Sequence, residues 1–348
     1  MNPIAVSSTA LVYAALNASG TSAPPPQQPQ RKPEWLKVKL PLGGNYRETK
    51  ALLSDLGLNT VCQEAGCPNI GDCYERHTAT FLLLGQLCTR GCTFCDIKRG
   101  KPNGIVDLEE PRRTAEAARR LGLQYIVVTS VTRDDLSDGG AFIFAETIQA
   151  MRRAIKGCQV EVLIPDFRGN LEALITVLEA RPDVLNHNTE TVPRLYRKVR
   201  LGAIYERTLE LLRRSKQHYP DIPTKSGIMV GCGEAKEELV QTMQDIRSCG
   251  TDILTIGQYL SPGGWHLPVE RYYHPDEFEE LRMAGEMMGF QYVYSGPLVR
   301  SSFHAGEQAA HLKKKVEDPE QSRRVENPER NRGEASLPNT DFSLNFAV

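Results

Sequence analysis

Short segments with strand character alternate along this chain with longer, charge-flanked segments of helical length, and this alternation constrains the fold most. The segments rich in β-branched and apolar residues are 80–84, 125–129, 160–164, 184–187, 226–230 and 253–257. The segments with helical patterns between them are 112–121, 140–156, 171–180, 208–218 and 236–249. Such alternation is typical of repeated βα units around a parallel sheet. Six units predict an α/β barrel or partial barrel, with a functional site at the carboxyl ends of its strands.

The two ends of the 348-residue chain differ in composition from the body between them. Residues 1–35 are rich in Ala, Ser, Pro and Gln, and residues 313–348 are charged and rich in Pro and Asn. Neither composition buries enough apolar surface to offset the entropy of an ordered chain. We therefore predict a disordered leader over 1–35, a folded body over 36–312 and a disordered charged tail over 313–348.

Charge and hydropathy argue against several classes of protein. The 42 basic and 43 acidic side chains leave a net charge of -1, so no overall field attracts nucleic acid or an anionic membrane. No apolar run reaches the length of about 18 residues that a transmembrane helix requires. The apolar run at 9–16 lacks the basic flank of a secretory signal, because no Lys or Arg precedes Arg31. We therefore expect a cytoplasmic protein that binds neither nucleic acid nor membranes.

The nine cysteines are unevenly distributed, because six of them lie between Cys62 and Cys95. Clustered thiols in a chain without a secretory signal indicate metal or redox chemistry in a reducing compartment rather than a disulfide framework. Cys158, Cys232 and Cys249 lie within or beside predicted core elements, and buried free cysteine is common. We interpret these three as packing residues.

The loop after the first predicted strand carries Cys88, Cys92 and Cys95 in a C-x3-C-x2-C spacing. Three thiolates this close together can face one cubane iron–sulfur cluster and leave its fourth iron without a protein ligand. A structural zinc site or an electron-carrying cluster requires four protein ligands, so an open iron indicates a cluster used for chemistry. The alternative is a zinc knuckle, which His77 could complete.

A second set of cysteines lies upstream, where Cys62, Cys67 and Cys73 form a C-x4-C-x5-C spacing. Gly and Pro residues between them bend the backbone, so that the three thiolates can converge. This set predicts a second cluster with three thiolate ligands. A zinc ribbon that borrows one cysteine from the other set is the alternative.

Taken together, these motifs resemble those of a known enzyme family. The C-x3-C-x2-C loop, with Phe94 before its third cysteine, resembles the radical S-adenosylmethionine (SAM) superfamily, in which the open iron binds SAM and this aromatic residue lies near its adenine. The two cysteine sets, in this order and only 15 positions apart, closely resemble lipoyl synthase. The similarity runs through most of the body, over the segments 162–168, 187–192, 225–230, 266–269 and 295–305.

The resemblance implies a fold and a set of cofactors. The fold would be a partial (β/α)6 TIM-like barrel of the radical SAM type over 80–312, closed by an N-terminal extension over 36–79 and by a C-terminal segment. There would be two 4Fe–4S clusters. The C-x3-C-x2-C set would hold the radical SAM cluster, and the C-x4-C-x5-C set would hold an auxiliary cluster.

One further ligand follows from the resemblance. Lipoyl synthases have an Arg-Ser-Ser-Tyr stretch near the C-terminus, whose serine oxygen binds the fourth iron of the auxiliary cluster. The matching residue here is Ser302, which the resemblance makes both a cluster ligand and a catalytic residue; without it, a helix cap or turn residue would be the natural interpretation. An alkoxide is a harder ligand than a thiolate, which suits an iron that must later be lost. The chain departs from the family at Phe303, where Tyr is usual, and also at Cys232 and in the 261–265 loop.

By resemblance, the chain is expected to insert sulfur at C6 and C8 of a protein-bound octanoyl-lysine, which gives the lipoyl group. The radical SAM cluster would cleave SAM reductively, and the resulting radical would remove hydrogen from the octanoyl chain. The auxiliary cluster would supply both sulfur atoms and be consumed. The expected partners are an octanoylated lipoyl carrier domain or the glycine cleavage carrier protein, an electron donor such as ferredoxin or flavodoxin, and an iron–sulfur carrier that repairs the cluster.

Polar residues after the fourth predicted strand are candidates for SAM binding. Asn188 and Glu190 are placed to meet the ribose and carboxylate of SAM, as is Asn186, although each could instead cap a helix. Arg133 and the two aspartates after it could contact SAM or form a solvated turn. Arg300 could serve the site or pair with a carboxylate.

Two other functions fit parts of the sequence. A different radical SAM enzyme that inserts sulfur, such as biotin synthase, would explain one cysteine set but not the second set together with Ser302. A zinc-binding interaction module without enzymatic activity would use the same cysteines. Iron, sulfide and zinc contents separate this module from an enzyme with two clusters.

Overall fold

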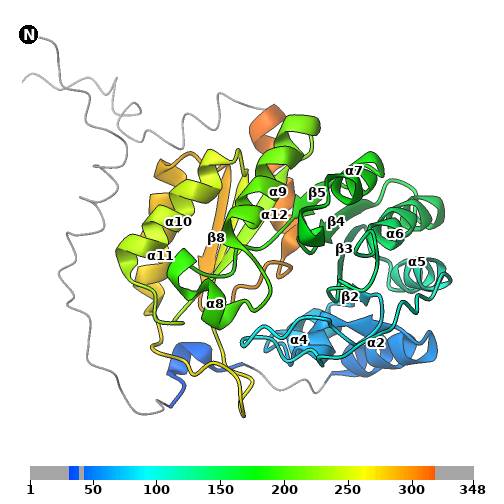
Figure 1. Cartoon of the computed structure of the whole chain (residues 1–348). Helices are drawn as coiled ribbons and strands as arrows, with labels where there is room; N and C mark the ends of the chain where they lie inside the picture. Colours follow the sequence, from blue (N-terminus) through cyan, green and yellow to red (C-terminus); the bar gives the residue numbers. More distant parts are fainter. Residues whose placement is uncertain (1–30, 39–42, 318–348) are drawn as a thin grey trace, which may run out of the picture. The chain divides into compact units, whose positions relative to one another are not determined.

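The computed structural model describes residues 31–38 and 43–317 (Figure 1). The chain divides into two units. The first unit ends at Gln308 and holds the sheet. Of the second unit only 309–317 is described, as part of helix α12 (Ala305–Glu317), which continues past the predicted end of the body at 312. The predicted leader lies outside the described residues as far as 30, and the predicted tail lies outside them from 318.

Eight strands form one sheet in the order of the sequence. Strands β2 to β8 are parallel, and β1 pairs with β2 in the antiparallel direction. Within the part of the chain that the structure describes, no ladder joins β8 to β1, so the barrel is open. The strands are β1 (Asn59–Thr60), β2 (Thr80–Leu83), β3 (Tyr125–Ser130), β4 (Gln159–Leu163), β5 (Val184–Asn186), β6 (Thr224–Val230), β7 (Ile253–Gln258) and β8 (Tyr292–Gly296).

A helix follows each of the strands β2 to β7, which gives the six predicted βα units. These helices are α5 (Glu110–Arg120), α6 (Ala141–Ala154), α7 (Leu171–Glu179), α9 (Tyr205–His218), α10 (Lys236–Ser248) and α11 (Pro275–Met287). Other helices lie in the connections and toward the N-terminus: η1 (Glu34–Leu36), α2 (Gly44–Asp55), α3 (Val61–Glu64), α4 (Ile70–Glu75), η2 (Phe167–Gly169), η3 (Pro193–Leu195) and α8 (Tyr196–Val199). The prediction of an α/β partial barrel with six units is therefore confirmed, and the sequence analysis missed α11 and β8.

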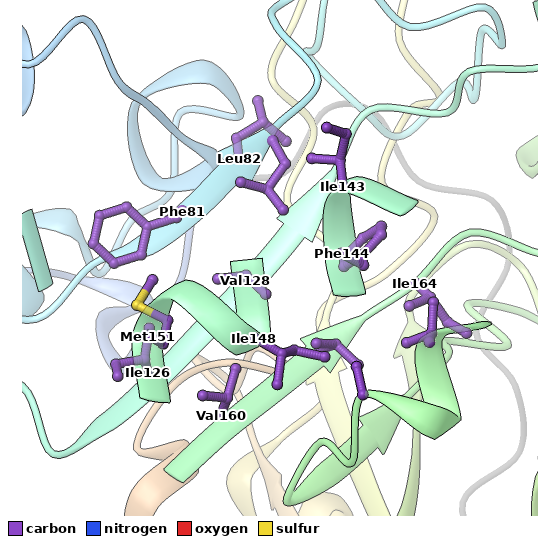
Figure 2. Close-up of a cluster of buried hydrophobic side chains, with 14 of the residues drawn as sticks. Phe81, Leu82, Ile126, Val128, Ile143, Phe144, Ile148, Met151, Val160 and Ile164 are labelled. Carbon is purple, nitrogen blue, oxygen red and sulfur yellow. The ribbon is translucent and has the colours of Figure 1, made fainter. Parts of the chain in front are cut away.

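Strand β3 illustrates how the sheet is buried on both faces. Ile126 and Val128 lie in the apolar cluster that packs the sheet against helix α6, together with Phe144 and Ile148 (Figure 2). The alternate residue Val127 lines a cavity on the opposite face of the sheet. Burial of each large apolar side chain contributes about 1.5–3 kcal/mol to folding, so the outer cluster stabilises the sheet while its inner face stays available for a site.

Local signals in the sequence set where several helices begin. Asn170 caps helix α7, because its side-chain oxygen accepts a hydrogen bond from the backbone N–H of Ala173 at 3.2 Å. Helix α11 begins with Pro275 after the capping residue His274, and the side chain of Glu277 accepts a hydrogen bond from the His274 N–H at 2.8 Å. These signals hold the carboxyl ends of the strands next to the helices that follow them.

Candidate active site

One large cavity of about 1010 Å³ lies within the first unit, against the inner face of the sheet. Its walls include ten of the residues predicted for the site from the sequence, namely Cys62, Cys67, Cys73, Cys88, Phe94, Cys92, Cys95, Asn188, Glu190 and Ser302. Residues of the strands β2, β3, β4, β6 and β7 line the same cavity, as do residues that follow β5. The fold thus brings together the two cysteine motifs, the end of strand β5 and the segment after strand β8.

The loop with Cys88, Cys92 and Cys95 follows strand β2 and is fixed at both ends by backbone hydrogen bonds. The N–H of Cys88 donates to the carbonyl of Lys98 at 2.9 Å, and the N–H of Thr93 donates to the carbonyl of Val199 at 3.0 Å. The first bond closes the loop on itself, and the second ties it to helix α8. The three thiols are thus held at the carboxyl end of the barrel, where sites in such folds lie.

Arg90, between the first two cysteines of this loop, anchors the loop to the neighbouring strands. Its guanidinium forms a two-point ion pair with Asp134, at 2.8 Å for each bond, and a third bond to Asp166 Oδ1 at 2.7 Å. Asp134 follows β3 and Asp166 follows β4, and the side chain of Asp166 is fully buried. The guanidinium of Arg90 holds the pKa of the Asp166 carboxyl well below its ordinary value, so Asp166 stays charged despite its burial.

From the sequence, Arg133 and the aspartates after it could either contact SAM or form a solvated turn. Arg133 is only 1% exposed and forms an ion pair with Asp135 at 2.8 Å, while Asp134 pairs with Arg90. None of the three lines the large cavity. Asp134 thus holds the cysteine loop through Arg90, and the buried ion pair of Arg133 shows that the interpretation as a solvated turn is wrong for Arg133.

The second cysteine set lies in two short helices of the N-terminal extension. Cys62 belongs to α3, Cys73 belongs to α4, and Cys67 lies in the turn between them. Gly66 adopts a positive φ of 54° in that turn, a conformation that glycine reaches without strain. The N–H of Cys67 then donates to the carbonyl of Cys62 at 3.0 Å, which closes the turn and aims both residues at the cavity.

Burial changes the acidity of the thiols. It raises the pKa of Cys62 and of Cys95 to about 12, and that of Cys73 and of Cys92 to about 11. Burial raises the pKa of Cys67 as well. At neutral pH these groups are protonated thiols, and binding of a cation releases their protons because a thiolate is the ligand form. A positively charged iron–sulfur core is therefore the kind of group that this site would bind.

The donor set also matches a cubane better than a single metal ion. Within residues 31–38 and 43–317, no three His, Cys, Asp or Glu side chains are arranged to hold one metal ion between them. Each thiolate on a cubane binds its own iron, so the thiols of one cluster need not meet at a point. His77, which was considered as a zinc ligand, does not line the cavity, and its Nδ1 lies 3.3 Å from the hydroxyl of Thr49.

Asn188 and Glu190 form a polar corner of the cavity. The side-chain N–H groups of Asn188 donate to Glu190 Oε1 at 3.0 Å and to the hydroxyl of Ser301 at 3.2 Å. The Oδ1 atom of Asn188 is buried and has no hydrogen-bond partner within the described part of the chain. Burial raises the pKa of the Glu190 carboxyl, while Arg200 and Asn188 act against the rise. The unpaired oxygen of Asn188 and the carboxyl of Glu190 both fit a ligand that carries amino or hydroxyl donors.

The remaining candidates separate into cavity residues and structural residues. Arg300 lines the cavity and donates to the carbonyl of Val299 at 2.7 Å, and no carboxylate pairs with it in the described part of the chain. Asn186 does not line the cavity, because it donates to Glu161 at 3.1 Å inside the sheet. The three other cysteines are buried away from the cavity, as predicted: Cys158, Cys232 and Cys249.

Several residues that shape the site were missed in the sequence. Arg200 lines the cavity and donates to the hydroxyl of Tyr196 at 2.9 Å, and no motif singled it out. Asn69 lies between two cysteines of the second set, and its side chain donates to the carbonyl of Leu298 at 2.8 Å. The position of Asn69 inside a motif was the one signal in the sequence that could have indicated its role. Its partner could not be predicted, because Leu298 is 229 residues away along the chain.

The fold and the cavity define a radical SAM enzyme. The model of the Radical SAM superfamily matches residues 82–246, which include the C-x3-C-x2-C loop. The crystal structure of HydG, a maturase of the [FeFe]-hydrogenase, is similar with a TM-score of 0.50 and 14% identity, and the match covers 88% of this chain and 66% of that one. At this identity the likeness concerns the fold alone.

The family within that class follows from closer relatives. The model of the N-terminal domain of lipoyl synthase matches residues 17–67. Lipoyl synthase of Rubrobacter xylanophilus is 56% identical over 277 residues, which is 80% of this chain and 86% of that protein. Lipoyl synthase of Symbiobacterium thermophilum is 57% identical over 280 residues, with 80% and 87% covered. The chain belongs to the lipoyl synthase family.

Proposed function

We propose that this protein is a lipoyl synthase, which inserts two sulfur atoms, at C6 and C8, into an octanoyl-lysine carried on a protein. The observation that carries the proposal is one cavity faced by both three-cysteine motifs and by Ser302, in a chain of the lipoyl synthase family. Sulfur insertion at unactivated carbons requires a radical source and a sulfur source near the same substrate, and cofactors supply such chemistry. A cavity with two separate sets of thiols meets this requirement.

The two cysteine sets hold different clusters in this proposal. The loop after β2 holds the radical SAM 4Fe–4S cluster through its three cysteines, and the N-terminal extension holds the auxiliary 4Fe–4S cluster through its own three cysteines and Ser302. When bound, these clusters and SAM supply the radical that removes hydrogen and the sulfur that replaces it.

The chain's own polar groups orient SAM. The unpaired Oδ1 of Asn188 accepts a hydrogen bond from an amino or hydroxyl group of SAM, and Glu190 beside it accepts another. The ring of Phe94 lies in the wall of the same cavity and offers an apolar surface to the adenine. Arg200 keeps this corner electrically balanced, because it acts against the burial-induced rise in the pKa of Glu190.

An apolar wall of the cavity suits a saturated acyl chain. The side chains that form it come from four strands: Leu82, Val127, Leu163 and Met229. Transfer of each methylene group from water to such a wall contributes about 0.8 kcal/mol, so an octanoyl chain gains by entering. The same wall excludes water from a reactive radical.

The partners follow from this chemistry. A lipoyl carrier domain or the glycine cleavage carrier protein presents the octanoyl-lysine, ferredoxin or flavodoxin delivers the electrons, and an iron–sulfur carrier rebuilds the consumed cluster. No helix among the described residues is long and apolar enough to cross a membrane. We place the reaction in the cytoplasm, where reducing conditions keep the thiols free.

An anaerobic assay tests the proposal. The protein is reconstituted with iron and sulfide, mixed with SAM, a reductant and an octanoyl-lysine peptide, and the products are followed by mass spectrometry. Mono-thiolated and then di-thiolated peptide should form together with 5′-deoxyadenosine. Formation of 5′-deoxyadenosine with an unchanged peptide would keep the radical SAM class and reject the substrate. A colourless protein that contains zinc would reject both.

A further inference from the structure

The segment 298–302, called the strap below, enters the barrel where two neighbouring strands carry glycine. Gly227 in β6 pairs with Thr255, and Gly257 in β7 pairs with Met229, so the two glycines lie diagonally on one face of the sheet. Side chains at these positions would point into the cavity, which both glycines line. The missing side chains leave a shallow seat in the wall.

The strap fills the seat at Gly257. A Cβ atom at this position would lie 2.1 Å from the carbonyl oxygen of Val299 and 3.3 Å from the guanidinium of Arg300. The first contact involves backbone, so no side-chain rotation could relieve it. The φ angle of Gly257 is not positive, so its backbone conformation does not require glycine. Glycine is needed because a side chain has no room at this position.

The neighbouring glycine makes room for the polar corner. A Cβ atom at Gly227 would lie 2.7 Å from Oδ1 of Asn188. Asn188 in turn donates to the hydroxyl of Ser301 at 3.2 Å, so the end of the strap touches the residue proposed to bind SAM. The two glycines therefore let the strap and Asn188 lie side by side against the sheet.

The auxiliary motif holds the strap from the other side. Asn69, two residues after Cys67, is 5% exposed and donates to the carbonyl of Leu298 at 2.8 Å. This bond joins the N-terminal extension directly to the start of the strap. The strap is thus fixed between the second cysteine set and strand β7, with Ser302 at its end facing the cavity.

We propose that Gly257 and Asn69 are positioning residues for Ser302: Gly257 provides the space for the strap, and Asn69 fixes its start beside the auxiliary cysteines. The inference rests on the ligand role proposed above for Ser302. Ser302 is separated from the nearest cysteine of its set by 229 positions, so its approach to the same cluster depends on these contacts. Both residues line the cavity, and the role proposed for them is to position Ser302.

Limited trypsin digestion of the cluster-loaded, full-length protein tests this anchoring. The variants are Gly257→Ala, which forces the strap off its seat, and Asn69→Ala, which removes one hydrogen bond without adding volume. In both, cleavage after Arg300 should become about tenfold faster, while cleavage after the exposed Lys156 stays unchanged. Unchanged cleavage after Arg300, or equal acceleration at both positions, would overturn the inference.

Two matched controls lie in the N-terminal extension. A Cβ atom at Gly44 would meet nothing within 4 Å, so Gly44→Ala should leave cleavage after Arg300 as in the wild type. Asn45 donates to the carbonyl of Glu75 at 3.0 Å, so Asn45→Ala removes a comparable bond away from the strap. Acceleration after Arg300 in either control would show that any local change loosens the strap, which would also overturn the inference.

A double variant shows whether Asn69 acts through Ser302. Ser302→Ala should speed the loss of iron to a chelator from the loaded protein, and addition of Asn69→Ala should speed it no further. If the double variant loses iron faster than Ser302→Ala by the same factor that Asn69→Ala causes alone, Asn69 acts on the cluster independently. This result would contradict the inference. If Ser302→Ala leaves iron loss unchanged while Asn69→Ala exposes Arg300, the ligand role of Ser302 is wrong and the anchoring of the strap stands.

Discussion

At the residue scale, the hydroxyl of Ser302 distinguishes the two cysteine sites, because a serine ligand is proposed for the auxiliary set alone. We predict that Ser302→Ala lowers the yield of di-thiolated peptide by at least about tenfold and leaves formation of 5′-deoxyadenosine intact. The physical reason is that Ser302 would bind the auxiliary cluster, whereas SAM cleavage depends on the other set. The two products are measured in the same anaerobic reaction.

Ser137 provides the matched control for this variant. It is an exposed serine at the rim of the barrel and does not line the cavity. Ser137→Ala should leave both products as in the wild type. Equal losses of both products in Ser302→Ala would indicate a general defect and contradict the separate role of the two sites.

His187 predicts a pH dependence of stability. The ring is fully buried between the carbonyl of Ile164 and the hydroxyl of Thr208, and burial, assisted by Arg200, lowers its pKa to about 3 despite Asp166. The folded protein therefore holds neutral His187, whose stabilisation is complete above the unfolded pKa of about 6.5 and is lost as the pH falls toward 3.

The variant His187→Gln separates this loss of stability from the pH effects of all other groups. Between pH 7.5 and 5.5, the wild type should lose about 1.4 kcal/mol more unfolding free energy than the variant, because only its unfolded chain takes up a proton at this position. Denaturant unfolding at the two pH values measures the difference. Identical pH dependence of the two proteins would contradict the depressed pKa of His187.

At the scale of an element, the C-x3-C-x2-C loop keeps its shape through Arg90. The side chain of Arg90 is 7% exposed, and Arg90→Ala leaves Arg207, at 3.1 Å, as the remaining ion-pair partner of the buried Asp166 carboxylate among the described residues. Loss of one partner from a buried pair costs about 3 kcal/mol, so the unfolding free energy should fall by about that amount. Denaturant unfolding of the loaded protein under anaerobic conditions checks it.

An exposed arginine offers the comparison. Arg112 pairs with Glu109 at 2.7 Å, and both side chains are mostly exposed. Because water screens such a pair, Arg112→Ala should cost less than about 1 kcal/mol. A cost for Arg90→Ala no larger than that for Arg112→Ala would argue against the anchoring role of Arg90.

The elements that could be predicted from the sequence are those whose pattern is local. Strand β3 and helix α6 show unbroken apolar patterns, and both were predicted within a few residues of their ends. Strand β8 was missed because Tyr292 and Tyr294 give it a half-polar, half-buried surface. Helix α11 was missed although it could be predicted from the sequence, because Pro275 and Glu277 are clear signals of a helix start.

The candidate site divides in the same way. The cysteine spacings and the family resemblance predicted the six thiols and Ser302 as site residues, because spacing within a motif is visible in the sequence. The seat at Gly257 and the bond from Asn69 to Leu298 were not predictable, since each depends on segments that only the folded sheet brings together. The family resemblance predicted Ser302 as a cluster ligand, but it did not explain which contacts hold Ser302 beside the auxiliary cysteines.

At the scale of the whole molecule, the two cysteine sets come from separate parts of the chain and should load independently. Replacement of Cys62, Cys67 and Cys73 by Ala should lower the iron content from about eight to about four atoms per chain. The same change in the other set should leave about four atoms as well. Iron and sulfide analysis after reconstitution measures this. Complete loss of iron in either variant would show that one cluster depends on the other.

The central claim is that one cavity brings a radical source and a sulfur source to the same octanoyl chain. The most direct test reconstitutes the protein with ³⁴S-labelled sulfide and follows a single round of reaction with SAM, reductant and octanoyl-lysine peptide by mass spectrometry. We predict a lipoyl product with label in both sulfur positions and no more than about one product per chain, because the sulfur comes from the auxiliary cluster. Unlabelled sulfur in the product, or an unmodified peptide beside abundant 5′-deoxyadenosine, would contradict the claim.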